Sequence, residues 1–234
     1  MTRNLRLVFS TPPDGVEDSQ YHAWYEEHVR DVVLVPGFFA ARRFRVNALV
    51  VRRPPSGYRF LTIYELGPQP GSIREHLTAL GRGRNPEWFG RMDYASWDCA
   101  LKPGYDEPEL GGEMFLALSS APGGMDPVAY DDYYRGHLLE NVAIDGIESG
   151  CRYTMTPVGG NAPRDEPLTH LALYQLGRPM SQVRVALKAA QDSGEMVLPP
   201  WFGGIRFASV DVVALGPRVS AGADANRPIE ETRT

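Results

Sequence analysis

Apolar and polar residues follow the same order of periods twice along the chain. Short alternating or β-branched runs predict strands, and longer runs with apolar residues three or four positions apart predict helices. The first half predicts strand, helix, strand, strand, helix, strand over Leu5–Ser10, Glu17–Val33, Phe38–Val46, Arg59–Leu66, Ser72–Leu80 and Ala95–Leu101. The second half predicts the same order over Glu113–Ser119, Pro127–Ala143, Ile147–Thr156, Thr169–Leu176, Met180–Gln191 and Arg206–Leu215.

Sequence motifs repeat in register with these predicted elements. The segment Tyr21–His28 returns 109 residues later as Tyr130–His137, and Trp88-Phe89-Gly90 returns 113 residues later as Trp201-Phe202-Gly203. Solenoid repeats run about 20–50 residues, so a repeat of about 110 residues indicates a duplicated domain. Residues present in both copies are therefore the first candidates for a shared role.

The order β-α-β-β-α-β is that of a ferredoxin-like unit, in which an antiparallel sheet carries its helices on one face. The other face is apolar and must be covered, and the second unit is the available cover. We therefore predict an α+β fold in which two tandem ferredoxin-like units pack their sheets face to face. The predicted boundaries are 1–102 for the first unit, 103–112 for a linker, 113–217 for the second unit and 218–234 for a disordered tail, and Val158–Pro167 is predicted to be a loop that could cover a pocket.

Composition narrows the class of protein. The chain has 234 residues, of which 43% are hydrophobic, as in ordinary soluble globular proteins. The sequence contains no apolar run of about 18 residues and no signal-peptide pattern, so we expect a cytoplasmic protein with no membrane partner. A net charge of −5 with interspersed signs argues against a nucleic-acid surface. Cys99 and Cys151 lie at non-equivalent positions and are expected to be packing residues.

The candidate chemistry lies on the first helix of each unit. Tyr21, Trp24, Tyr25 and His28 are spaced i, i+3, i+4 and i+7, so they share one helix face. The equivalent residues in the second unit are Tyr130, Tyr133, Tyr134 and His137. An imidazole among aromatic rings is a candidate general acid or base in an apolar pocket, so His28 and His137 are the predicted catalytic residues and the rings are predicted to contact substrate. The alternative is a packed core with a hydrogen-bonded histidine.

Further polar residues recur around this face. An acid follows each histidine by three residues, Asp31 in one unit and Glu140 in the other, and either the histidine or a nearby arginine could be its partner. Arg43 and Arg152 are candidates for a clamp on a substrate carboxylate or enolate, or for a structural ion pair. Tyr64 and Tyr174 could donate a hydrogen bond into the same cavity. The two Trp-Phe-Gly motifs are expected to be packing plugs, and among the unrepeated histidines only His170 is expected to face a cavity.

Several other chemistries find no motif in the sequence. One histidine with one carboxylate is too small a ligand set for zinc, so no metal site is predicted. Glycine-rich phosphate loops, dinucleotide fingerprints and the G-x-S-x-G elbow are also missing. We therefore expect an enzyme that needs no cofactor, with haem held by His28 or His137 as a lesser alternative.

These motifs resemble a known group of proteins. The Tyr-x-x-Trp-Tyr-x-x-His-Val helix from Tyr21, the Val35-Pro36-Gly37-Phe38 turn, Arg42-Arg43-Phe44 and the doubled element order resemble the EthD-like branch of the dimeric α+β barrel superfamily. The resemblance covers residues 4–102 and 113–216 and implies that one chain forms the barrel that single-unit relatives form as a homodimer. A monomer would then complete the barrel, and further oligomerisation stays open.

Three functions fit these observations. The first is a cofactor-independent lyase, isomerase or cyclase, in which His28 or His137 transfers a proton on a small, mainly apolar carbonyl compound. The second is a cofactor-free monooxygenase of a phenolic substrate, which the resemblance also allows. The third is a non-catalytic protein that binds a small apolar ligand. The resemblance indicates the fold and leaves the reaction open.

Overall fold

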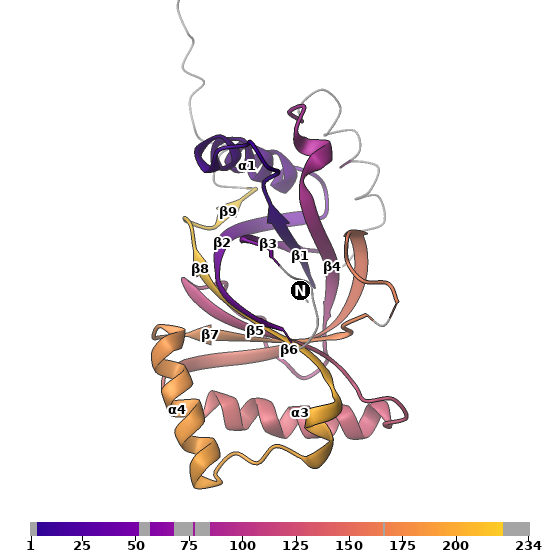
Figure 1. Cartoon of the computed structure of the whole chain (residues 1–234), viewed down its shortest axis with the longest axis vertical. Coiled ribbons are helices and arrows are strands. Elements are labelled where there is room, and N and C mark those ends of the chain that lie inside the picture. Colours follow the sequence, from indigo (N-terminus) through magenta and orange to yellow (C-terminus); the bar gives the residue numbers. More distant parts are fainter. Residues whose placement is uncertain (1–3, 52–56, 68–76, 78–84, 166, 222–234) are drawn as a thin grey trace, which may run out of the picture.

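The chain forms one closed antiparallel β-barrel with helices on its outer surface (Figure 1). The computed structural model describes residues 4–51, 57–67, 77, 85–165 and 167–221. The barrel closes in the order β3-β1-β4-β6-β7-β5-β8-β2-β3, and β9 pairs outside it with β2. The strands are β1 Asn4–Thr11, β2 Phe38–Val51, β3 Phe60–Leu66, β4 Asp93–Leu101, β5 Glu113–Ser120, β6 Ile147–Gly160, β7 His170–Leu176, β8 Arg206–Ala214 and β9 Val219–Ser220.

Two long strands close the barrel. The first half of β2 pairs with β3, and its second half, from Phe44 to Val51, pairs with β8. In the same way β6 pairs first with β7 and then, from Tyr153 to Gly160, with β4. The repeat predicted two sheets packed face to face as a barrel within one chain, and the structure shows that hydrogen bonds join these sheets at both seams. The predicted ends of these strands are too early because residues beyond them form the seams, and Val158–Gly160 belong to β6 and not to a loop.

The helices lie at opposite ends of the barrel in Figure 1. Helix α1, Asp18–Val33, covers β2, while α3, Pro127–Val142, covers β6 and α4, Met180–Ser193, contacts β5. Short 3-10 turns, η1 Phe89–Arg91 and η2 Pro200–Gly204, precede β4 and β8. No helix in the described part of the chain is long and apolar enough to cross a membrane.

Alternation along each strand sends one set of side chains into the barrel and the other towards the helices. The interior is filled by a continuous buried cluster that includes Trp97, Phe44, Tyr153 and both cysteines. Two separate clusters lie outside, one beneath α1 and one beneath α3 and α4. Because the interior is filled, a ligand site is to be sought on the outer, helix-covered faces.

The C-terminal segment is ordered further than the sequence predicts. The predicted tail from Arg218 onwards begins with structure, because Val219 and Ser220 pair with Ala41 and Ala40 of β2. Arg218 also forms a two-pronged ion pair with the buried carboxylate of Glu65. The return strand was missed because its two residues carry no period of their own. The helix predicted over 72–80 lies, apart from residue 77, outside the described residues.

Replacing Phe44 by alanine tests the closed barrel. Phe44 is 0% exposed in the barrel interior, at the point where β2 passes from β3 to β8. We expect Phe44→Ala to lower the free energy of unfolding by about 3–5 kcal/mol in urea, the usual cost of emptying a core aromatic site. Phe39→Ala, at a nearby ring that is 42% exposed, is the control and should cost less than about 1 kcal/mol. Equal costs would contradict a packed barrel interior.

Candidate functional site

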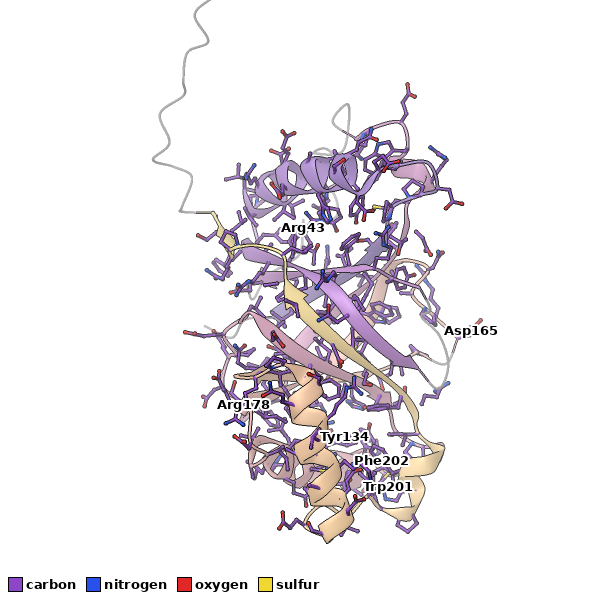
Figure 2. The ribbon with its side chains drawn as sticks, turned by 60° about the vertical axis from the view of Figure 1, so that its left-hand side comes forward. Arg43, Tyr134, Asp165, Arg178, Trp201 and Phe202 are labelled. Carbon is purple, nitrogen blue, oxygen red and sulfur yellow. The ribbon has the colours of Figure 1, made fainter. Side chains whose placement is uncertain are left out.

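The aromatic residues of α1 and α3 face the barrel as the spacing predicts. Tyr21 and Tyr130 are fully buried, and each hydroxyl is hydrogen-bonded to a serine of the unit's first strand, Ser10 at 2.7 Å and Ser119 at 2.8 Å. Each helix is thereby fixed to its sheet at the same point. The Trp-Phe turns close over these faces, with Trp88 5.1 Å from Trp24 and Trp201 4.8 Å from Tyr133 (ring centroids), and Figure 2 shows Trp201 and Phe202 beside α3. They are the packing plugs that the sequence predicts.

The repeated histidines lie on the plug side of the helix. His28 stacks on Trp24 at 4.8 Å, and His137 stacks on Tyr133 at 5.3 Å. Burial lowers the pKa of His28 to about 4; Asp31 opposes this shift and Arg43 adds to it. Burial also lowers the pKa of His137, although Glu140 contacts its Nδ1 at 3.1 Å and opposes the shift. Both imidazoles are therefore neutral at pH 7 and able to accept a proton.

The repeated arginines lie on the other side of the central tyrosine. The guanidinium of Arg43 stacks on Tyr25 at 4.4 Å, and that of Arg152 stacks on Tyr134 at 4.7 Å. Each histidine follows the central tyrosine by three residues. The helix residue that binds the arginine precedes the same tyrosine by three residues. The histidine and the arginine therefore lie on opposite sides of the tyrosine. The structure does not bring the predicted histidine and arginine together at one face of a cavity.

The two arginines bind helix residues at equivalent positions, but these two residues differ in charge. Arg43 Nη2 lies 3.1 Å from His22 Nδ1, whereas Arg152 Nη1 donates to Asp131 Oδ1 at 3.0 Å. Burial and the neighbouring Arg43 lower the pKa of His22, so this ring is a neutral acceptor. The arginines therefore pair with residues 22 and 131, and not with the predicted Asp31 and Glu140.

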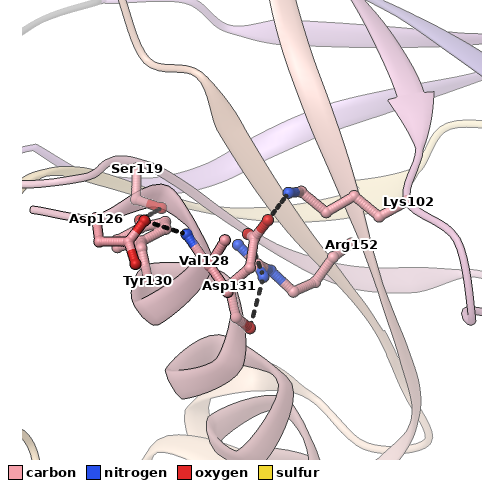
Figure 3. Close-up of polar contacts among 7 residues, drawn as sticks. All are labelled: Lys102, Ser119, Asp126, Val128, Tyr130, Asp131 and Arg152. Carbon is pink, nitrogen blue, oxygen red and sulfur yellow. Dashed lines mark hydrogen bonds and ion pairs between the residues drawn. The ribbon is translucent and has the colours of Figure 1, made fainter.

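The second unit gathers several charges around Arg152. Lys102 Nζ donates to the same carboxylate of Asp131 at 2.6 Å, so two cations share one anion (Figure 3). Burial opposes ionisation of Asp131, but Lys102 and Arg152 outweigh it and its pKa is lowered. Arg152 is only 1% exposed, and its Nε and Nη2 have no partner among the described residues. This cluster keeps a net positive charge and two open donors.

His170 adds a neutral imidazole to this cluster, the second such ring of this unit after His137. It opens β7 opposite Thr154 and so lies diagonally across from Arg152 on the helix-facing side of the sheet. Its ring lies 4.9 Å from that of Tyr130, and its buried Nδ1 has no partner among the described residues. Burial, with Lys102 and Arg152, lowers its pKa to about 4. We expected His170 to face a cavity, but it faces the helix layer. Phe60 occupies the equivalent position in the first unit.

Two cavities occupy equivalent positions in the units, between the helix, the edge of the long strand and the segment that leaves the last strand. The second-unit cavity is about 620 Å³ and is lined by Leu138, Gly150 and Cys151 with the linker residues from Gly104 to Glu109. The first-unit cavity is about 190 Å³ and is lined by Val29, Ala41 and Arg43 with Leu215–Pro217 and Val219. Strand β9 covers the edge of β2, whereas no strand in the described chain pairs with the first residues of β6 on this side. This difference leaves the second cavity larger.

The large cavity adjoins the Arg152 cluster. Gly150 precedes Arg152 by two residues on the same face of β6, and Leu138 follows Tyr134 by one helical turn. A side chain at Gly150 would approach the Tyr174 ring to 2.9 Å, which explains why this wall lacks one. A cavity of this size can hold a small organic ligand.

The remaining predicted residues have mainly packing contacts. Tyr64 packs edge-on against Phe38 at 5.4 Å, and Tyr174 stacks on Phe115 at 5.8 Å. Lys102 and Asp131 were not singled out by the sequence analysis. The sequence shows an acid at position 131 where the first unit has His22. This difference points to a charged cluster only when Arg152 is known to face position 131. Among the described residues, no group of three or more His, Cys, Asp or Glu side chains could hold a metal ion.

The lowered pKa values predict how stability depends on pH. His28 and His170 have pKa values of about 4 in the folded chain and near 6.5 when unfolded, so the unfolded chain binds more protons between these pH values. Stability is therefore lost as pH falls from about 6.5 to 4. We expect His28→Phe, measured by urea unfolding at pH 7, 5.5 and 4.5, to lose less stability over this window than the wild type. Arg178→Gln, at an exposed ion pair with Asp145, should follow the wild-type curve. Identical curves for all three proteins would contradict a buried neutral His28.

Comparisons with known proteins agree with this architecture. No protein-family model matches the sequence, and no curated protein sequence matches it significantly. An anthrone oxidase-like protein aligns with a TM-score of 0.53 at 14% identity, covering 94% of this chain and 94% of its own. A provisionally named monooxygenase of Fusobacterium nucleatum subsp. nucleatum aligns with a TM-score of 0.52 at 10% identity and the same two coverages of 94%. At these identities the likeness shows the fold alone, a closed antiparallel eight-stranded barrel.

Proposed function

We propose that the protein is a cofactor-independent oxygenase that oxidises a small phenolic compound bound in its second unit. The observation that carries this proposal is the buried guanidinium of Arg152, which has two open donors and lies two residues along β6 from Gly150 in the wall of a cavity of about 620 Å³. The names of the two structural neighbours, anthrone oxidase-like and monooxygenase, favour the same reaction class. Proteins with one fold catalyse many different reactions, so the residues of the site carry the proposal.

The chemistry proposed for this site begins with removal of a proton. A neutral imidazole takes the proton of the phenol or of its keto tautomer, and the Arg152 guanidinium stabilises the resulting oxyanion. The electron-rich anion then reacts with dioxygen at a ring carbon and forms a carbon–oxygen bond. Loss of the remaining hydrogen of that carbon and cleavage of the oxygen–oxygen bond release water and leave a carbonyl. The electrons come from the substrate, and dioxygen is the only co-reactant.

Two histidines can serve as the proton acceptor. His137 is the residue expected from the sequence, and Glu140 fixes its orientation through Nδ1. His170 lies nearer to Arg152 and has an open buried Nδ1. We assign the role to His170 because it lies diagonally across from Arg152 on the same face of the sheet. Tyr130, Tyr133 and Tyr134 would form the aromatic wall.

The same proposal includes the origin of the chain as a tandem duplication of one ferredoxin-like unit of the EthD-like branch. Equivalent strands take equivalent places in the barrel, and equivalent serine–tyrosine bonds fix α1 and α3. The two cavities share four lining positions at a constant offset of 109 residues, which are Glu26, Val29, Arg30 and Ala41 in the first unit and Arg135, Leu138, Leu139 and Gly150 in the second. Under this proposal the first unit, with His28, Arg43 and Tyr64, keeps the frame of the site and lacks its charged cluster.

A lyase, isomerase or cyclase would share the first step of this mechanism. Proton removal and oxyanion stabilisation are common to both, and only the oxygenase consumes dioxygen. A protein that merely binds an aromatic ligand would use the same cavity without turnover. Oxygen uptake therefore separates the oxygenase from the other two candidates.

Arg152 is the residue whose replacement tests the oxygenase. With anthrone as the probe, whose enol tautomer is a phenol, we expect oxygen uptake by the wild-type protein. Arg152→Met should lower kcat by about 100- to 1,000-fold, the usual effect of losing an oxyanion donor. Arg178→Gln, a surface arginine, is the matched control and should retain full activity. Turnover of phenols without oxygen uptake would contradict the proposal and favour a lyase, isomerase or cyclase.

Exchanging residues between the units tests which histidine accepts the proton. His170→Phe places the first unit's Phe60 at this position, so it is expected to preserve the fold and lower kcat by at least about 100-fold. His137→Ala should have a much smaller effect, and His28→Ala none. A large loss in His137→Ala with an active His170→Phe would move the role to His137. Circular dichroism of each variant checks that the fold is intact.

A further inference from the structure

The small cavity of the first unit is lined by the buried guanidinium of Arg43. Arg43 lines this cavity, is 9% exposed, and its buried Nε has no partner among the described residues. Its Nη2 contacts His22, which burial and Arg43 itself keep neutral by lowering its pKa. Its other contacts are the faces of Tyr25 and Tyr21, which carry no charge at pH 7. A buried guanidinium in this state attracts an anion.

The charge of the lining fits a monoanion. Besides Arg43, the ionisable residues that line the cavity are Arg30 and Glu26, so its formal charge is +1. Both Arg30 and Glu26 are exposed at the rim, whereas Arg43 lies inside. One carboxylate group would neutralise the cavity and supply an acceptor for Nε.

The rest of the lining is aliphatic. Val29, Ala41, Leu215, Pro217 and Val219 surround the remaining space of about 190 Å³. The segment that carries Leu215–Val219 is held over the cavity by β9 and by the ion pair of Arg218 with Glu65. Such a space accommodates a short hydrocarbon chain and excludes an aromatic ring system of the size that the second cavity can hold.

We propose that this first-unit cavity is a second ligand site, specific for a short-chain aliphatic monocarboxylate whose carboxylate pairs with Arg43. The site is separate from the oxygenase site proposed for the second unit and does not depend on it. The ligand would lie beneath β9 and link the C-terminal return segment to α1. Binding would therefore also stabilise this segment.

Titration of the purified protein with acetate, propionate and butyrate tests the site. The NMR signals of the His22 ring report binding next to Arg43, and we expect saturable shifts whose affinity rises about fourfold with each added methylene. Bound anion should raise the pKa of His22 by about 1 unit, because a nearby negative charge favours the imidazolium. Acetamide, which is neutral and similar in shape, should produce no saturable shift. Inorganic phosphate, the competing anion, should bind more weakly than butyrate.

Two variants and one control make the test decisive. Arg43→Met should abolish the saturable shifts, and Val219→Phe should abolish them by filling the cavity while Arg43 stays in place. Arg178→Gln should bind as the wild type does. Equal binding of acetamide and acetate, tighter binding of phosphate than of butyrate, or undiminished binding by folded Arg43→Met or Val219→Phe would each overturn the proposal. Oxygen uptake by the second unit is a separate readout, so failure of one proposal leaves the other standing.

Discussion

The sharing of β2 and β6 between the two halves of the barrel is the constraint on which the rest of the structure depends. Each strand forms hydrogen bonds with its own unit through its first half and with the other unit through its second half. The second halves of β2 and β6 would be unpaired edges in an isolated half, and the seams cover both of them. The seams also determine where an open strand edge remains. The first half of each long strand does not pair with the opposite unit, so one of its edges stays open to other segments.

This arrangement determines where ligands can bind. The interior of an eight-stranded barrel is narrow enough for side chains to fill, and here Trp97, Phe44 and Tyr153 are among those that fill it. Function therefore moves to the helix-covered outer faces, where the uncovered first halves of β2 and β6 border a cavity. In the first unit β9 pairs with this edge, and in the second the linker passes it at a distance. One short strand thus accounts for the difference between a cavity of about 190 Å³ and one of about 620 Å³.

The repeat in the sequence predicted most of this frame. The spacing of Tyr21, Trp24, Tyr25 and His28 correctly placed one helix face against the sheet, and the Trp-Phe turns correctly closed over it. The resemblance implied a barrel, but the strand pairs that close it could not be predicted, because pairing beyond Val46 and Thr156 joins residues far apart in the chain and leaves no local period. The charged cluster was missed for a similar reason. Lys102, Asp131 and Arg152 come from three elements, and their contact follows from the register of β6 and not from any motif.

The two units serve as each other's control for this cluster. Leu215 occupies the position of Lys102, since each donates its backbone N–H to the carbonyl of the equivalent arginine at 2.9 Å, and Phe60 occupies that of His170. The first unit folds around the same arginine with an apolar residue at both positions, so the frame does not need the charges. Burying ionisable groups costs free energy that hydrophobic replacements avoid. The cluster around Arg152 therefore calls for a reason other than stability, and a bound anionic ligand supplies one.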